Sequence, residues 1–319
     1  MAKVKTFKTI FPAVSVPLND DFSINEAEFR VYLRWIKSFY GKGIEGLVCN
    51  GHTGLTRAER KRVVEICAEE CGDVMTIISG VNCENTQESI EMAAEAKAAG
   101  ADGILLMPPH MWLRFGMNAN APFQYVKDVA EGADIDIIIH LYPATSKAFY
   151  PVETLIKMCK EIEHVKCIKM GTRVTSIYEH DVRLLREECP DISLITCHDE
   201  TLCVSWFPGM DGALIGFAGC VPELICPARE VFANPDKHTL KEAQDWSDRI
   251  YHISQAIYGG GQPSGEAHAR LKEALYQRGI FSSALMRKPV LPLNQEEKDW
   301  VALGLKRSQL PKVDMEQYK

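Results

Sequence analysis

Short apolar runs alternate with segments of helical periodicity along most of the chain. The runs are rich in β-branched residues and are bounded by glycine, proline or polar turns, a pattern typical of buried strands. Between most of them, apolar residues recur at the spacing of an amphipathic helix. The predicted strands are Ala13–Pro17, Gly46–Asn50, Thr76–Gly80, Gly103–Met107, Ile137–Tyr142, Val165–Lys169, Ser193–Cys197 and Gly212–Gly216.

The predicted strands recur roughly every 30 residues until the last, closer pair, which is the rhythm of an eight-stranded parallel α/β barrel. An open doubly wound sheet is the competing architecture, but eight units in this length favour closure, and no Gly-x-Gly-x-x-Gly follows the first strand. Later in the chain only helices are predicted, over His238–Tyr258, Glu266–Arg278 and Gln295–Leu305. We therefore predict a (β/α)8 TIM barrel over residues 1–230 and a small helical C-terminal domain over residues 231–319.

The composition is that of an ordinary soluble protein, with 46% hydrophobic and 25% charged residues in a chain of 319. A net charge of −7 and the absence of a basic run argue against nucleic-acid binding. No apolar stretch approaches the roughly 20 residues that span a bilayer. The 11 cysteines contain no Cys-x-x-Cys pair and the 9 histidines form no cluster. We therefore expect free thiols in a reducing cytoplasm, no metal, no membrane partner and a small-molecule ligand.

A lysine closes the sixth predicted strand. Because strand side chains alternate between two faces, we expect Val165, Cys167 and Lys169 to share one face. If that face lines the barrel interior, the amine of Lys169 lies at its mouth, where partial desolvation disfavours the ammonium form. Such an amine can attack a ketone and form a Schiff base. The alternative is a strand-end lysine that extends to solvent.

Other candidate residues follow the remaining strands, because the active sites of such barrels lie at the carboxyl ends of the strands. The turn around Gly51 brings backbone N–H groups together in a way that suits a carboxylate. His140 precedes Tyr142 by two positions and is expected below it as a hydrogen-bonded core residue. Asp199, after the seventh strand, is suited to a helix N-cap. The candidate substrate-binding or catalytic residues at strand ends are Gly51, His52, Thr53, Trp112, Tyr142, Lys169 and Gly216.

In their order and spacing these motifs resemble the dihydrodipicolinate synthase/N-acetylneuraminate lyase superfamily of Schiff-base-forming 2-oxo-acid enzymes. The resemblance implies that Lys169 forms a Schiff base with pyruvate, that Tyr142 moves protons and that the loop with Thr53 holds the pyruvate carboxylate. It also implies a homo-oligomer, either a tetramer or a dimer, and no cofactor. The matching motifs are Gly-His-Thr-Gly at 51–54, Ala-Asp-Gly-Ile-Leu-Leu-Met-Pro-Pro at 101–109, Leu-Tyr at 141–142, Ile-Lys at 168–169 and Arg-Lys-Pro-Val-Leu-Pro-Leu at 287–293.

The chain also departs from the family pattern. His52 replaces a hydroxyl residue of the usual Gly-Thr-Thr-Gly-Glu or Gly-Ser-Thr-Gly-Glu loop, and Leu55 replaces its glutamate. His110 and the methionine after it stand where synthases of the family carry a Tyr-Tyr pair. The hydroxyl relay of a dihydrodipicolinate synthase is therefore broken, and we expect that activity to be absent.

The segments around Trp112 and Ala148–Pro151 are more similar to the hydratase-aldolase branch of the superfamily. In that branch Trp112 would stack on an aromatic aldehyde, whereas the alternative is a ring packed at the base of a loop. We expect a class I lyase or aldolase acting on pyruvate or a substituted 2-oxo acid, specifically a hydratase-aldolase that releases pyruvate and an aromatic or hydrophobic aldehyde.

Two alternatives remain. One is a dehydratase or a sugar-acid (2-keto-3-deoxy acid) aldolase that uses the same lysine. The other, of a different class, is a non-catalytic 2-oxo-acid-binding protein. The sequence leaves open the identity of the aldehyde, the physiological direction and the roles of His52, His110 and His140.

Overall fold

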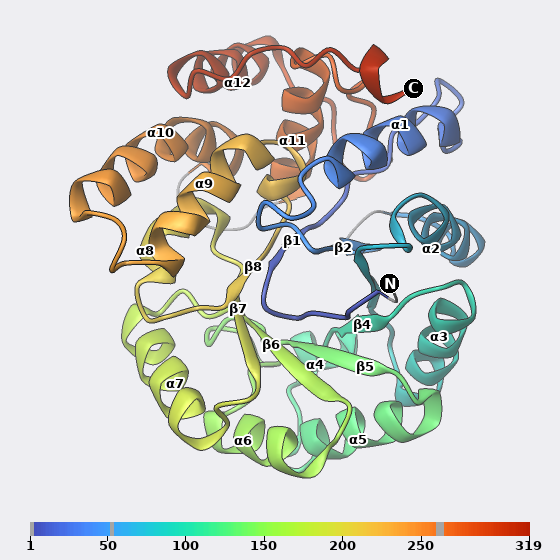
Figure 1. The fold of residues 1–319 in the computed structure, drawn as a ribbon. Helices are drawn as coiled ribbons and strands as arrows, with labels where there is room; N and C mark the ends of the chain where they lie inside the picture. Colours follow the sequence, from blue (N-terminus) through green and yellow to red (C-terminus); the bar gives the residue numbers. More distant parts are fainter. Residues whose placement is uncertain (1–2, 52–53, 260–264) are drawn as a thin grey trace.

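The structure, a computed structural model, describes residues 3–51, 54–259 and 265–319. Its parallel strands form a nearly closed ring with helices outside it (Figure 1). Neighbouring strands pair in sequence order, and β8 pairs with β1. A bridge between Ala13 and Val48 links β1 to β2, where the Val14 N–H donates to the Val48 carbonyl at 2.9 Å. The strands are β1 (Ile10–Pro12), β2 (Gly46–Cys49), β3 (Thr76–Val81), β4 (Gly103–Leu106), β5 (Asp136–His140), β6 (Val165–Met170), β7 (Ser193–Thr196) and β8 (Gly212–Ile215).

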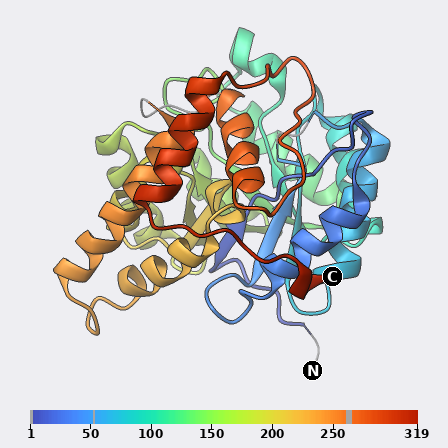
Figure 2. The same ribbon diagram turned by 90° about the horizontal axis from the view of Figure 1, so that it is seen from above.

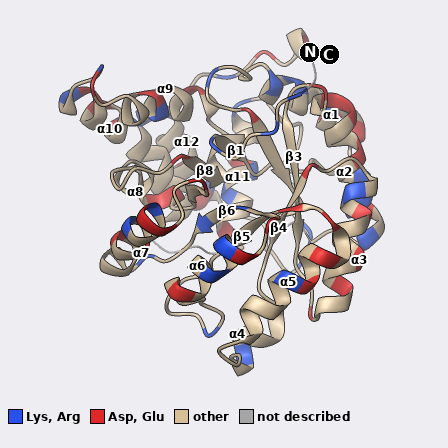
Figure 3. Ribbon diagram, turned by 60° about the horizontal axis from the view of Figure 1, so that its bottom comes forward, with Lys and Arg blue, Asp and Glu red and all other residues tan. Residues whose placement is uncertain are grey.

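Helices that follow the strands surround the barrel (Figure 1). Acidic and basic residues are interspersed along these outer helices, as Figure 3 shows for α2 and α7. The predicted (β/α)8 barrel is thus confirmed. The helices between and after the strands are α1 (Glu26–Lys37), α2 (Arg57–Cys71), α3 (Thr86–Ala98), α4 (His110–Phe115), α5 (Ala121–Ala133), α6 (Val152–Glu161), α7 (Thr175–Glu188), α8 (Leu202–Trp206) and α9 (Pro222–Ala233), with 3-10 turns η1 (Asp199–Thr201) and η2 (Phe217–Gly219).

Three further helices follow the barrel: α10 (Leu240–Tyr258), α11 (Gly265–Gln277) and α12 (Gln295–Arg307). They pack against one another, and Figure 2 shows α11 and α12 side by side. A short 3-10 turn, η3 (Glu316–Tyr318), then contacts α1. These helices lie where the sequence predicts them. The proposed domain boundary at residue 230 falls inside α9 and stays a prediction. No helix in the described part of the chain is long and apolar enough to cross a membrane.

Each strand contributes an apolar side chain to the barrel interior, and none of these is more than 2% exposed. Cys167 of β6 belongs to this layer, so Lys169, two residues further, faces the same way at the mouth. Val165 instead packs with the larger cluster outside this layer. The β5–β6 register shifts between Ile137 and Ile138, which adds a residue to β6 and breaks the alternation. The prediction that Val165 shares the face of Lys169 is therefore wrong. The interior residues are Phe11, Val48, Ile78, Leu105, Met107, Ile138, Cys167, Ile195 and Leu214.

The first strand begins three residues earlier than Ala13–Pro17, the predicted segment, and ends at Pro12. Ile10 is held from both sides, by pairing with Ala213 and by a hydrogen bond from its N–H to the Gly43 carbonyl at 3.0 Å. The predicted segment forms a loop over the mouth of the barrel, with Val14 and Val16 at most 5% exposed. This buried loop has the same run of apolar residues as a buried strand, so the sequence pattern does not distinguish the two.

Candidate active site

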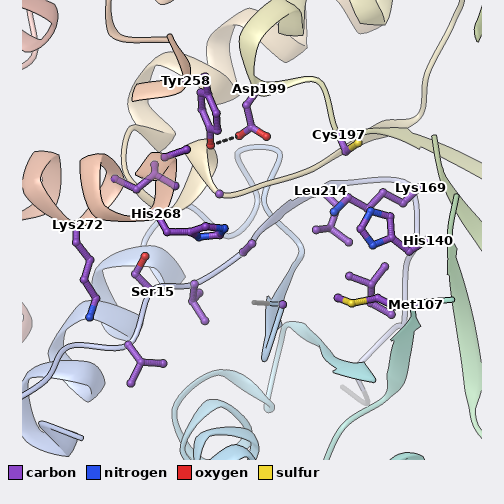
Figure 4. A pocket seen from close by; sticks show the side chains of 18 of the residues that line it. Ser15, Met107, His140, Lys169, Cys197, Asp199, Leu214, Tyr258, His268 and Lys272 are labelled. Atoms are coloured by element: carbon purple, nitrogen blue, oxygen red, sulfur yellow. Dashed lines mark hydrogen bonds between the residues drawn. The ribbon is translucent and has the colours of Figure 1, made fainter. Parts of the chain in front are cut away.

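A cavity of about 370 Å³ opens at the carboxyl ends of the strands. This size is typical of small-molecule sites, which measure roughly 300–1,000 Å³. The loop after β1, the ends of β5 to β8 and helix α11 all contribute side chains to its lining, some of which Figure 4 shows. The C-terminal helices therefore contribute to the cavity.

Lys169 lies in this cavity, between His140 of β5 and Ile195 of β7 in the strand register. Burial lowers the pKa of its amine. Cys197 and Asp199 act in the opposite direction, and the Arg173 guanidinium adds to the lowering. A lowered pKa increases the fraction of neutral amine at neutral pH, which is the nucleophilic form.

Tyr142 lines the same cavity, two residues after the end of β5. Its ring meets that of His140 edge to face, with centroids 4.9 Å apart and planes at 71°. Burial raises the pKa of the Tyr142 phenol to about 12. The phenol therefore carries its proton at neutral pH and is a hydrogen-bond donor toward the cavity. His140 also lines the cavity beside Lys169 and is 9% exposed, as the sequence predicts for a core histidine below Tyr142.

Asp199 is a buried carboxyl group in the cavity lining, 9% exposed. Its Oδ1 accepts hydrogen bonds from the Tyr258 hydroxyl at 2.7 Å (Figure 4) and from the Phe217 N–H at 3.0 Å. Burial raises its pKa to about 6, while these two hydrogen bonds and Lys169 oppose the increase. The prediction of a helix N-cap is wrong, because the side chain binds groups of η2 and α10 and none of its own helix.

The raised pKa of Asp199 predicts that the free energy of unfolding depends on pH. The ordinary pKa is 3.8 and the folded value about 6, so the folded chain holds this proton more tightly than the unfolded chain. The contribution to stability is therefore largest below pH 4 and is lost as the pH rises to 6, by about 3 kcal/mol. Asp199→Asn keeps an oxygen for both hydrogen bonds but does not ionise. We therefore expect the variant to become more stable than the wild type by about 3 kcal/mol as the pH rises from 4 to 6.

Urea unfolding at a series of pH values measures this difference. Asp191→Asn, at an exposed position before β7, is the matched control and should follow the wild-type curve. Parallel stability curves for wild type and Asp199→Asn would contradict the assigned pKa of Asp199.

A buried ion pair ties the ends of β6 and β7 together beside Lys169. Arg173 Nε donates to Glu200 Oε1 at 2.7 Å, and the Glu200 side chain is 2% exposed. The same guanidinium donates to the carbonyls of Gly171 at 2.8 Å and Cys197 at 3.1 Å. These bonds fix both loops, and a buried pair with every donor used in this way is costly to break.

Gly216, predicted at a strand end, lines the cavity where β8 meets α10 and α11. A Cβ at this position would lie 2.9 Å from Leu271 Cδ1 and 3.4 Å from the Tyr258 hydroxyl. The glycine thus lets α11 approach the end of β8. Gly51 also lines the cavity. His52 and Thr53 lie outside the described residues.

The structure does not bring Trp112 to the cavity lining. Its ring is 9% exposed and packs edge to face against Tyr125 and Tyr150, with centroids 5.6 and 6.2 Å away. In this position it is a packing residue of α4. His110 lies at the start of α4, with Nδ1 3.4 Å from Glu84 Oε1.

Helix α11 supplies cavity residues that the sequence does not single out, among them His268 and Lys272. Burial and the charge of Lys169 lower the pKa of His268. No strand-end rule points to these residues, because they belong to a helix that follows the barrel. In the ranges that the structure covers, no group of three or more His, Cys, Asp and Glu is arranged to hold a metal ion.

The Dihydrodipicolinate synthetase family matches residues 6–308 of the chain. A 4-hydroxy-tetrahydrodipicolinate synthase of Bartonella bacilliformis is 26% identical over 311 residues, which cover 96% of this chain and 99% of that protein. The structure of a dihydrodipicolinate synthase from Aquifex aeolicus superposes with a TM-score of 0.83 at 19% identity, covering 97% of this chain and all of that one. A prophage protein of the same family from E. coli K12, solved in complex with pyruvate, gives 0.84 at 20% identity, covering 96% and 100%. At these identities the solved structures establish a shared fold.

Proposed function

The chain belongs to the dihydrodipicolinate synthetase family, and we propose that it is a hydratase-aldolase that releases pyruvate and an aromatic or hydrophobic aldehyde. Members of the family are lyases that use a lysine Schiff base, and this chain is an enzyme of that kind. The proposal assigns the Schiff base to Lys169 and the proton transfers to Tyr142. The observation that carries it is an amine with a lowered pKa at the strand ends, in one cavity with a protonated phenol.

In the proposed reaction the neutral amine of Lys169 attacks the ketone carbon of a substituted pyruvate. Tyr142 donates a proton to the carbinolamine oxygen, and water leaves to form the iminium. Water then adds across the carbon–carbon double bond conjugated to the iminium, which places a hydroxyl on the distal carbon and a proton on the nearer one. The iminium accepts the electron pair of the breaking carbon–carbon bond, while the Tyr142 phenolate takes the proton from that hydroxyl as it becomes the aldehyde carbonyl. The enamine is then protonated at carbon, and water releases pyruvate and the free amine.

The substrate carboxylate is proposed to lie at the turn that begins with Gly51, which reaches the cavity. The resemblance assigns this role to the loop that also contains His52 and Thr53. Apolar side chains provide room for the rest of the substrate, in keeping with an aromatic or hydrophobic body. The apolar residues of the cavity lining include Leu18, Leu55, Leu271 and Met286.

Borohydride reduction in the presence of pyruvate tests the proposal directly. We expect one reduced pyruvate adduct per chain, located on Lys169 by peptide mass spectrometry. Absence of an adduct on this residue would overturn the Schiff-base assignment. An adduct without turnover of any aldehyde would favour the non-catalytic 2-oxo-acid-binding alternative.

A panel of aromatic and sugar-like aldehydes with pyruvate separates the lyase alternatives. We expect aldol products with the aromatic aldehydes. Products with sugar-like aldehydes alone would favour the sugar-acid aldolase, and loss of water without carbon–carbon cleavage would favour the dehydratase. We expect no condensation of pyruvate with aspartate semialdehyde, because His110 replaces a tyrosine of the synthase relay.

We also propose that the protein is a cytoplasmic homo-oligomer. All 11 cysteines are free, in keeping with a reducing compartment. Sedimentation analysis measures the oligomeric state, and a monomer at micromolar concentration would contradict the proposal.

A further inference from the structure

The cavity contains a buried cation that has no acidic partner within ion-pair distance among the described residues. Lys272 of α11 lines the cavity and is 6% exposed. Its Nζ donates one hydrogen bond, to the Leu285 carbonyl at 2.7 Å. Burial lowers its pKa to about 8, and Arg287 adds to the lowering. At neutral pH most of the population therefore keeps the charge, with N–H donors to spare.

The two arginines of the cavity are balanced by carboxylates. Arg287 makes two hydrogen bonds to the Glu59 carboxylate, at 2.6 and 2.7 Å. Arg173 pairs with Glu200, as described above.

The remaining acids do not neutralise Lys272. Asp199 lies close enough to Lys169 for each to influence the pKa of the other. Glu28 favours the charge of Lys272 through space, but its Oε1 accepts the Ser282 N–H at 2.6 Å, and it forms no ion pair with Lys272. Glu28 thus compensates the charge of Lys272 only through space, and Lys272 forms no ion pair with a carboxylate of the described residues.

A buried ammonium without an ion-pair partner is energetically unfavourable, and an anionic ligand would reduce that cost. In Figure 4, Lys272 and Lys169 lie on opposite sides of the pocket, with His268 between them. A substrate attached to Lys169 through its ketone would therefore extend toward Lys272 with the part that leaves as the aldehyde.

We propose that Lys272 binds a second carboxylate, carried by the aldehyde portion of the substrate. This inference rests on the proposed function and specifies its substrate class. The substrate is a substituted pyruvate whose apolar body ends in a carboxylate remote from the ketone. The carboxylate accepts the N–H donors of Lys272 that the Leu285 carbonyl leaves available.

Two aldehydes of similar shape test the inference in the direction of aldol addition to pyruvate: 4-carboxybenzaldehyde and 4-methylbenzaldehyde. We expect the wild type to prefer the carboxylated aldehyde. Lys272→Met keeps the unbranched stem and removes the charge. We expect it to lose roughly 10- to 100-fold in kcat/KM for the carboxylated aldehyde, mostly through KM, and less than about 2-fold for the methyl analogue.

Lys306→Met, at an exposed position of α12, is the control and should leave both values unchanged. Borohydride trapping of pyruvate alone separates this inference from the proposed function. An intact pyruvate adduct in Lys272→Met, together with loss of the carboxylate preference, supports it. An equal loss of pyruvate trapping would place the pyruvate carboxylate at Lys272 and overturn it. If the wild type forms the pyruvate adduct but shows no preference for the carboxylated aldehyde, this inference alone is overturned. If the wild type forms no adduct, the inference and the proposed function are both overturned.

Discussion

Replacing Lys169 with alanine is expected to abolish both the pyruvate adduct and turnover while the fold persists. The amine is the nucleophile of the proposed reaction, and the other lysine of the cavity, Lys272, lies on the opposite side of the pocket. We expect kcat to fall by roughly 10⁴-fold or more, as for other enzymes that lose a covalent nucleophile. Steady-state kinetics and intact-protein mass after borohydride reduction measure the two effects.

Lys166→Ala is the matched control, because Lys166 is on the same strand outside the cavity. It should keep both adduct and activity. The circular dichroism spectrum of Lys169→Ala should match that of the wild type, because the side chain faces a cavity and its loss creates no void in the packed interior. A folded Lys169→Ala protein that still turned over substrate would refute the assignment.

Tyr142→Phe is expected to lower kcat by roughly 10²- to 10⁴-fold, the contribution that general acid–base catalysis usually makes. The change removes a hydroxyl and keeps the ring, so its contact with His140 is preserved. Because the phenol is proposed to act in forming the imine as well as in cleavage, trapping of the pyruvate adduct should also become slower. Rapid-quench borohydride trapping measures that step separately from turnover.

Tyr276→Phe serves as the control for this experiment. Tyr276 is exposed on α11 and lies outside the cavity lining, so its hydroxyl should not affect the rate. An unchanged rate in Tyr142→Phe would remove its proposed role in proton transfer.

The sequence predicts the barrel well because each strand is buried on both sides and therefore reads as a short apolar run. Alternation along β6 correctly places Lys169 above Cys167, since both lie on the regular part of the strand. The same rule fails at Val165, where the register shift with β5 changes the face. A shift of this kind depends on how two strands pair, which a single strand's pattern does not contain.

The rest of the site depends on contacts between distant segments. From its local sequence Asp199 resembles a helix cap. Its actual partners, Tyr258 and the Phe217 N–H, come from other elements and are not visible in that local sequence. Lys272 and His268 reach the cavity only because α11 packs across the barrel mouth. Tertiary packing of that kind has no local signature, whereas a strand end has one.

The approach of α11 to β8 at Gly216 divides the pocket between two stretches of the chain. The amine and phenol proposed to react come from the barrel, whereas residues 267–287 contribute other lining side chains. Under the proposed function, selectivity would therefore depend in part on a different segment from the chemistry. Exchanging the C-terminal third between relatives should change which aldehydes are accepted while the residues proposed to react stay the same. Such a chimera must keep glycine at position 216, because a side chain there would collide with α11.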